Sequence, residues 1–190
     1  MEEMSLGFYP TSDVLQCLRC APCADLSESG VIRADAVMFA ATPGGNPGGG
    51  RIGRIVFRQR GDRVTITGTV RGLTPGEHGM HIHEFGSLGN GCNAAGMHFN
   101  PTNMRHGGLT SAIRHVGDLG NIVANANGVA TIDITDTIIS LRSGSPNDVV
   151  GRALVIHADR DDLGLGNSPL SGTTGNSGPR VACGIIRRIS

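Results

Sequence analysis

Histidines are the residues of this chain whose type and spacing best suit chemistry, and five of the seven fall between His81 and Asp118. Side chains two apart on a strand point to the same face, so His81 and His83 can direct their imidazoles at one ion. His115 and Asp118 are three apart, a spacing that a tight turn can bring onto a second ion. Five imidazoles and a carboxylate suit zinc or copper better than magnesium or calcium. The segment therefore predicts a metal site.

Two kinds of element must position these side chains. An alternating strand can carry His81 and His83, whereas His98 and His106 lie in a stretch rich in Gly and Asn that does not favour a regular element. A folded loop must therefore bring the later histidines to the ions. Scattered surface and core histidines would be the alternative, and it suits a lone histidine better than this cluster.

Composition narrows the class of protein. The 190 residues include 30 glycines, few aromatics and no Trp, which is typical of short strands joined by many turns. The formal net charge is zero, and all 16 basic residues are Arg. Balanced charge gives no indication of nucleic-acid binding. No apolar run approaches the length of a membrane span, so we expect no contact with membranes.

Alternation with a period of two predicts an all-β domain. In Val64–Val70, for example, Val64, Ile66 and Val70 face one way and three threonines face the other. About eight antiparallel strands are expected in a β-sandwich or flattened barrel with two long functional loops, 85–114 and 159–180. The expected strands cover 34–39, 54–58, 64–70, the segment around His81 and His83, 121–124, 130–134, 152–157 and 181–186.

Residues 1–30 differ from the domain expected at 31–190, because they show no alternation and contain Cys17, Cys20 and Cys23. We interpret them as a mobile extension. The three cysteines could form a thiolate site for copper or zinc, or be surface thiols without a fourth ligand. The acidic start lacks the features of a secretory signal. On that basis the sequence predicts a cytoplasmic protein.

Several short motifs resemble those of the copper/zinc superoxide dismutases. They are Gly79-Met-His-Ile-His-Glu-Phe-Gly86, Gly96-Met-His-Phe-Asn-Pro101, Arg105-His-Gly-Gly108, Arg114-His-Val-Gly-Asp-Leu-Gly-Asn121, Asp161-Asp-Leu-Gly164 and Gly178-Pro-Arg-Val-Ala-Cys-Gly184. Their order matches the family, and the similarity extends over roughly residues 34–190. The resemblance implies a Greek-key fold, copper and zinc as cofactors, and superoxide as the substrate.

The resemblance also implies a ligand for each metal position. Copper would be bound by His81, His83, His98 and His157, and zinc by His98, His106, His115 and Asp118. His98 would bridge the two ions as an imidazolate, which two divalent cations make feasible near neutral pH. Three imidazoles and a carboxylate close a tetrahedral zinc site and so imply a structural role. His78, by the same resemblance, packs and forms hydrogen bonds.

Three further roles follow from the resemblance. Asp161 would join His81 to His106 and fix the orientation of both rings. Arg180 would draw the superoxide anion toward copper, and with His98 it is a candidate catalytic residue. Cys92 and Cys183 would form a disulfide within the chain, contributing roughly 4 kcal/mol by closing a long loop.

The chain departs from the family pattern at two places. Residues 167–174 carry no charge where many relatives have Glu and Lys, so electrostatic steering should depend mostly on Arg180 and the metals. Arg187 and Arg188 replace small or apolar residues at the family's dimer contact. Phe85, Gly86 and Val150 still fit that contact. A homodimer is therefore expected, and a copper chaperone could load the metal.

Two other functions compete with dismutation of superoxide. A copper chaperone or metal carrier is suggested by Cys17, Cys20 and Cys23, but the chain lacks the Cys-x-Cys tail of such relatives and retains His157. An inactive binding module is the third possibility. The complete ligand set, together with Asp161 and Arg180, argues against it.

Overall fold

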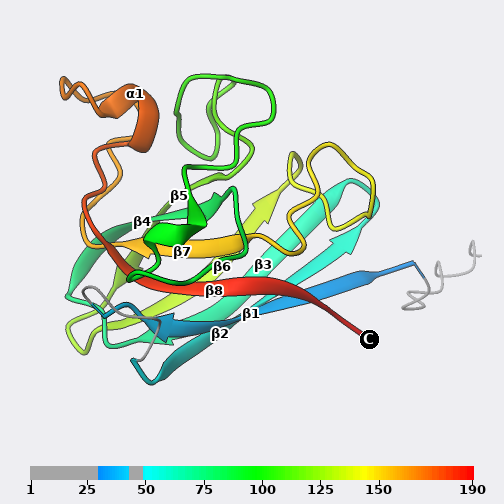
Figure 1. Ribbon diagram of the computed structural model, residues 1–190, viewed down its shortest axis with the longest axis horizontal. Coiled ribbons are helices and arrows are strands. Elements are labelled where there is room, and N and C mark those ends of the chain that lie inside the picture. The colour runs from blue at the N-terminus through cyan, green and yellow to red at the C-terminus, as the bar shows by residue number, and fades with distance from the viewer. Residues whose placement is uncertain (1–29, 43–48) are drawn as a thin grey trace, which may run out of the picture.

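The computed structural model describes residues 30–42 and 49–190, and its strands close into a barrel in the order β1-β2-β3-β6-β5-β4-β7-β8 (Figure 1). The all-β prediction with about eight antiparallel strands is confirmed. The predicted extension with Cys17, Cys20 and Cys23 lies outside the described residues. The strands are β1 Ile32–Ala40, β2 Arg51–Arg60, β3 Arg63–Arg71, β4 Gly76–His83, β5 Asp118–Ala124, β6 Val129–Asp136, β7 Ala153–His157 and β8 Arg180–Ile189.

Side-chain alternation builds the barrel interior. On β3, Val64, Ile66 and Val70 are buried, as their spacing predicts, and the three threonines between them are on the opposite face and more exposed. Phe57 and Met38 from the neighbouring strands are fully buried in the same apolar core. Strand β3 therefore places one face in the core and the other toward solvent, as expected for an antiparallel sheet, whereas β7 and the second half of β4 are buried on both faces.

A Greek-key crossover positions the strand that carries the first histidines. The chain leaves β3 and enters β4, which pairs with β5 on one side and β7 on the other rather than with β3. His81 lies opposite Val155 in the register with β7, two residues before His157. The topology thus brings histidines far apart in sequence to adjacent strands.

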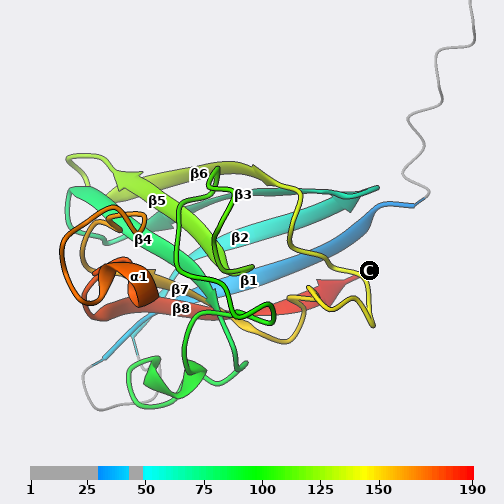
Figure 2. The ribbon, with the colours of Figure 1, turned by 90° about the horizontal axis from the view of Figure 1, so that it is seen from above.

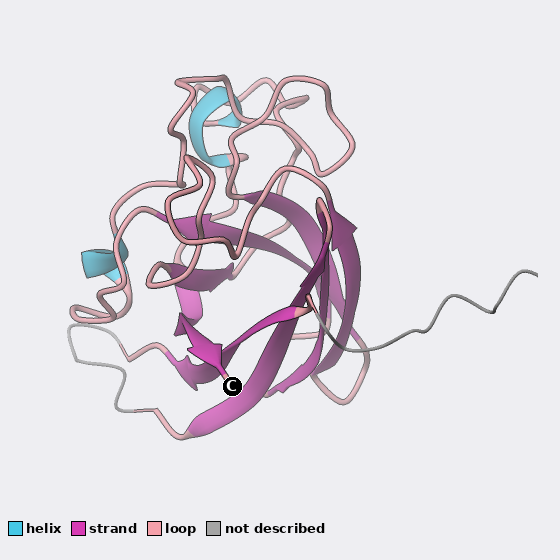
Figure 3. Ribbon diagram, turned by 90° about the vertical axis from the view of Figure 1, so that its right-hand side faces the viewer, coloured by secondary structure: helices cyan, strands magenta, loops and turns pink. Residues whose placement is uncertain are grey.

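Two long loops lie outside the barrel, at 84–117 between β4 and β5 and at 158–179 between β7 and β8, close to the predicted bounds. The first contains the 3₁₀ helix η1 (Asn93–Ala95) and the second contains α1 (Ser171–Thr174). Figure 1 shows α1 away from the strands where the chain passes from β7 to β8, Figure 2 shows it from above, and in Figure 3 both helices lie outside the strands. Within the described residues, no helix is long and apolar enough to span a membrane.

Candidate metal centre

Two groups of ligand atoms converge at the side of the barrel where the loops meet β4 and β7. In each group all atoms lie within 4.8 Å of one another, and every residue is buried. His81 and His98 belong to both groups. The first group also contains His83 and His157, and the second also contains His106 and Asp118. His115 adjoins the second group, with its Nδ1 3.1 Å from an oxygen of Asp118.

Different elements supply the two groups. β4 provides His81 and His83, and β7 ends on His157. His98 comes from the first long loop, where a β-bridge to His83 places it directly against β4. The rings of His81 and His98 stack with their centroids 3.9 Å apart. The strands therefore form one wall of the centre and the loop forms the other.

In the first group, each histidine from a strand has one ring nitrogen held by an outer partner. Nε2 of His81 lies 2.8 Å from Asp161, Nδ1 of His83 lies 2.9 Å from the carbonyl oxygen of Gly96, and Nδ1 of His157 lies 3.0 Å from that of Gly178. An N–H donated to each acceptor leaves the other nitrogen with a lone pair directed into the centre. This is the tautomer that a metal-binding histidine requires.

Three of the inward nitrogens lack partners within the protein, and two others, Nε2 of His83 and Nε2 of His157, lie 3.3 Å from each other. Nδ1 of His81, Nε2 of His98 and Nδ1 of His106 are buried without a hydrogen bond. His106 Nδ1 lies 3.0 Å from Asp118, but that contact does not have hydrogen-bond geometry. Buried polar atoms are normally satisfied, so three such atoms facing one centre indicate that it holds metal ions. The donor set fits copper and zinc.

Asp118 organises the second group. Its carboxylate contacts His98 at 2.9 Å and His115 at 3.1 Å, and it accepts backbone N–H groups from Gly107 and His115. Arg114, which is buried, donates to the backbone carbonyl oxygen of Asp118 and pairs with Asp136. Asp118 is thereby held in place through both its carboxylate and its backbone carbonyl.

Asp161 links the two groups from the second long loop. Its oxygens lie 2.8 Å from Nε2 of His81 and 2.8 Å from Nε2 of His106. Asn121 on β5 holds the backbone of Asp161, because its amide donates to the Asp161 carbonyl at 2.8 Å and accepts the Asp161 N–H at 2.7 Å. One buried carboxylate therefore sets the orientation of two rings.

The pKa values of the ionisable groups divide along the same line. Burial lowers the pKa of His81, His83 and His98, and it lowers that of His157 to about 4. Burial also disfavours the charged form of His106, but its close contacts with the carboxylates of Asp118 and Asp161 outweigh it and raise the pKa of His106 to about 9. The four histidines of the first group thus stay neutral, whereas protons compete with metal at His106 in the second group.

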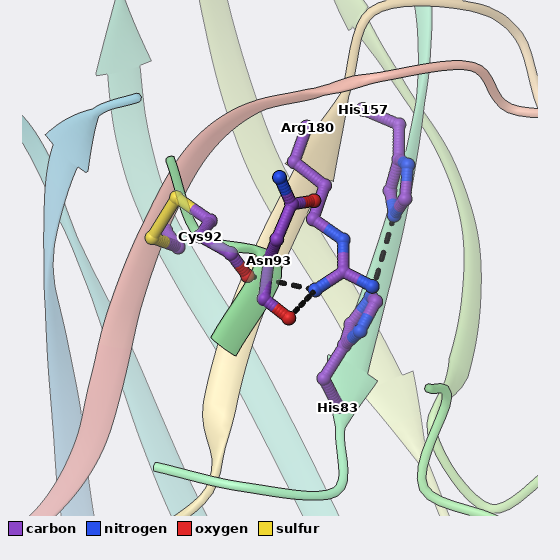
Figure 4. Close-up of a disulfide and its surroundings, with 6 residues drawn as sticks. His83, Cys92, Asn93, His157 and Arg180 are labelled. Atoms are coloured by element: carbon purple, nitrogen blue, oxygen red, sulfur yellow. Dashed lines mark hydrogen bonds between the residues drawn. A yellow bond between two sulfur atoms is a disulfide. The ribbon is translucent and has the colours of Figure 1, made fainter. Parts of the chain in front are cut away.

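Arg180 lies between the disulfide and two of the histidines, His83 and His157 (Figure 4). Its Nη1 donates to the carbonyl oxygen of Cys92 at 2.7 Å, and its Nη2 donates to that of Gly96. The Cys92–Cys183 disulfide fastens this loop to β8, which confirms the expected pairing. Because the Gly96 carbonyl also accepts from His83, the guanidinium and a metal-facing ring share one anchor.

These features define a β-barrel metalloenzyme with two adjoining ion sites. The family model for copper/zinc superoxide dismutase matches residues 51–186. An extracellular Cu-Zn superoxide dismutase of Haemonchus contortus is 56% identical over 156 residues, covering 82% of this chain and 84% of the relative. A Cu-Zn superoxide dismutase of Onchocerca volvulus is 55% identical over 139 residues, covering 70% of this chain and 87% of its own.

A solved structure, the crystal structure of the clock protein EA4, matches with a TM-score of 0.73 and 44% identity, covering 83% of this chain and 94% of that one. The chain belongs to the copper/zinc superoxide dismutase family. Its activity is the conversion of superoxide to O2 and H2O2, and its metals are copper and zinc.

The predicted cytoplasmic location is wrong. The relative from Haemonchus contortus is named extracellular, and so is one from Brugia pahangi that is 54% identical over 137 residues, covering 70% of this chain and 68% of its own. The disulfide agrees with an oxidising compartment. The misprediction came from the acidic start of the sequence, which carries no information about where the folded domain works.

Sequence reasoning missed three parts of the site. The Gly96 carbonyl is a backbone atom, so no residue type marks it. Asn121 was quoted within a motif and as the first residue of a strand, but its bonds to Asp161 span 40 positions. Arg114 precedes His115 in the same motif, yet its pairing with Asp136 depends on the β-barrel.

Proposed function

We propose that copper is bound by Nδ1 of His81 and by Nε2 of three histidines, and that zinc is bound by His98 Nδ1, His106 Nδ1, His115 Nδ1 and Asp118. The three histidines that bind copper through Nε2 are His83, His98 and His157. The observation that supports this most directly is the arrangement of ring nitrogens: the outer nitrogens of His81, His83 and His157 are held, and the inner nitrogens either have no hydrogen bond or contact only other proposed ligands. His98 serves both ions because its two nitrogens face the two groups.

Metal content per chain tests these assignments. His83→Ala should lose copper and keep zinc, whereas His115→Ala should lose zinc and keep copper, each measured by elemental analysis of the folded protein. His78→Gln is the matched control. That histidine is equally buried but contacts only the loop at Thr74 and the carbonyl oxygen of His157, so both metals should remain. Unchanged content of both metals in His83→Ala would refute the copper assignment.

Each catalytic residue has a separate role. When bound, copper supplies the one-electron oxidation and reduction that convert two superoxide anions to O2 and H2O2. Arg180, held by backbone carbonyls, presents its N–H groups to the incoming anion. When His98 Nε2 is not bound to copper it can hold a proton and pass it to the reduced product, since that nitrogen has no other partner in the protein, and water supplies the second proton of H2O2. Asp161 keeps the rings of His81 and His106 aligned.

The role of Arg180 is tested by anion binding. In Arg180→Met, the affinity for azide, followed by its absorption band, should fall about 10- to 100-fold, because one charged hydrogen bond is worth about 1.5–3 kcal/mol. Arg180→Lys should restore part of the affinity, since charge is kept but the fork of donors is lost. Equal azide affinity in all three proteins would remove Arg180 from the substrate site.

We also propose that the protein works outside the cell. The support is the naming of two relatives as extracellular and the buried disulfide, which persists in oxidising compartments. Fractionation of cells that express the native gene, with an antibody against the folded domain, tests this. Recovery of the protein in the medium is expected, and its exclusive recovery in the cytosol would contradict the proposal.

A homodimer is the proposed assembly. Phe85 is 58% exposed, and a neighbouring groove of about 240 Å³ is partly apolar, so a second copy could bury both. The groove is lined by Asp35, Val37, Phe39, Leu88, Ile185 and Arg187. Sedimentation should give the mass of two chains for the native protein and one for Phe85→Glu. A monomeric native protein would exclude this assembly, and with it the expected contact at Gly86 and Val150.

Loading of copper by a separate copper chaperone stays a prediction. The alternative function of a metal carrier depended on Cys17, Cys20 and Cys23, which are not among the described residues. No feature of residues 30–42 or 49–190 favours it over dismutation. Comparing copper content before and after Cys17→Ser, Cys20→Ser and Cys23→Ser would show whether these thiols hold metal.

A further inference from the structure

A basic pocket of about 450 Å³ opens outside the metal centre, at the hairpin between β2 and β3. It is lined by Val31, Arg58, Arg60, Asp62, Arg63 and Thr65. The three arginines are all exposed, and Asp62 is the single acid in the lining. The pocket is part of a wider imbalance, because residues 32–71 hold seven arginines and two aspartates although the whole chain is neutral.

The register of the hairpin concentrates this charge. Arg60 on β2 lies directly opposite Arg63 on β3, and like charges in facing positions destabilise a sheet. Among the described residues, neither Arg60 nor Arg63 makes an ion pair. The hairpin therefore presents two arginines at facing positions in one pocket lining, which an anionic partner would stabilise.

The chain itself supplies a complementary segment that begins at the pocket wall. Residues 1–29 contain five acids and one Arg, a net charge of −4, and the chain continues from them into Val31 in the lining. Glu28 and Asp25 stand three and six residues before Val31. At about 3.3–3.6 Å per residue they can reach about 10 and 20 Å. Attachment at Val31 also holds them at an effective concentration on the order of millimolar, well above that of a free anion.

We propose that the acidic segment before Gly30 binds this pocket, with Asp25 and Glu28 against Arg60 and Arg63. Two facing cations with no partner of their own meet two tethered carboxylates. The contact neutralises the basic face at low salt. Screening releases it at high salt, so exposure of this face to other anions depends on ionic strength.

The absence of lysine from the sequence permits a sharp test on the full chain. Arg60→Lys introduces a single lysine into the pocket, where a carbodiimide can couple it to a neighbouring carboxylate. Peptide mapping should find it joined to Asp25 or Glu28. Arg71→Lys is the matched control, because Arg71 is also exposed but lies at the far end of β3, about 26 Å from Arg63 at 3.3 Å per residue. Both variants should keep native dismutase activity.

The yield of coupling to residues 1–29 should be about fivefold higher for a lysine at position 60 than for one at position 71. This difference should disappear in about 1 M NaCl, because that salt concentration shortens the screening length to about 3 Å. Adding Asp25→Asn and Glu28→Gln to Arg60→Lys should remove the product. Mixing ¹⁴N- and ¹⁵N-labelled chains distinguishes links within a chain from links between chains. Equal yields at the two positions, coupling to Asp62 alone, or links only between chains would overturn the proposal.

Discussion

The two sides of the metal centre are built in different ways. Three of the four proposed copper ligands come from strands, and their outer nitrogens are held by Asp161 and by backbone carbonyls. The other side is a loop, in which His98, His106 and His115 contact one carboxylate, that of Asp118. The strand side is rigid through backbone pairing, whereas the loop side depends on polar contacts with a single group.

This difference assigns separate tasks to separate parts of the chain. The strands supply three of the four proposed ligands of the redox ion, and the loops supply the fourth, His98, and the acceptors that orient the other three. Asp161 and His98 are the connections between the sides. Changes on the strand side should therefore abolish turnover, while changes on the loop side should weaken metal retention and loop order.

The largest effect is expected from exchanging one ligand on each side. His83→Ala should reduce dismutase activity by more than about 100-fold, since even outer partners of metal ligands are worth about 10–100-fold. His115→Ala should retain a measurable fraction of the activity when copper is supplied. A superoxide-consumption assay at known copper content compares them, and equal losses would mean that the two sides do not differ as described.

Breaking the disulfide should loosen the loop side more than the strand side. In Cys183→Ser, the free energy of unfolding should fall by roughly 4 kcal/mol, because a cross-link over 91 positions no longer restricts the unfolded chain. Denaturant titration measures this, and Cys92→Ser should give the same loss. Hydrogen exchange should rise first in 84–117. A uniform rise over β4 and β7 would show that the sheet depends on the loop.

Removing the connection between the sides should have an intermediate effect. Asp161→Asn leaves one ring of the pair His81 and His106 without an acceptor, so metal affinity or activity should fall by about 10–100-fold. Competition with a chelator measures the affinity of each metal. Asp162→Asn is the control, because that neighbouring carboxylate contacts Ser171 rather than a histidine. A loss no larger than that of the control would exclude the linking role.

Acidity should affect the two sides of the metal-free protein in opposite directions. The pKa of His157 falls to about 4 in the folded chain from an ordinary 6.5, so the unfolded chain binds more protons between those values. The contribution of His157 to the free energy of unfolding is therefore fully present above pH 6.5 and is lost as the pH falls toward 4. His106, with its pKa raised to about 9, contributes stability that is present below pH 6.5 and lost as the pH rises through 9.

The midpoint of thermal unfolding of the metal-free protein should therefore fall from pH 6.5 to 4 and also decline toward pH 9. In His106→Gln the alkaline decline should flatten, while the acid decline should persist. An unchanged alkaline decline in that variant would show that another group is responsible.

The smallest effect concerns salt. Residues 163–179 of the second long loop carry no charge, so few fixed charges beyond Arg180 guide the substrate. The rate should change by less than about twofold as the Debye length shortens from about 10 to 8 Å. Stopped-flow measurements at increasing NaCl test this. Leu170→Lys should steepen the dependence, and a steep dependence in the native chain would show that other charges steer.

Much of the fold followed from local patterns, because alternation such as that of Val64, Ile66 and Val70 records which face is buried. The spacing of His81 and His83 indicated a metal, but the allocation of residues to two ions came from resemblance to a family. Loop positions such as His106 and His115 have no periodicity from which to infer them. Contacts made by backbone atoms, such as the Gly96 carbonyl, depend on the folded path and leave no mark in residue types.

The bonds between Asn121 and Asp161 have a consequence for engineering. Because β5 holds the start of the second loop by its backbone, the tip of that loop, 165–169, can be shortened, lengthened or exchanged while the linking carboxylate and the Gly178 carbonyl that holds His157 stay in place. The approach to the metals could thus be redesigned by changing this part of the loop alone, to admit larger oxidants or contact with an electrode, without altering the barrel.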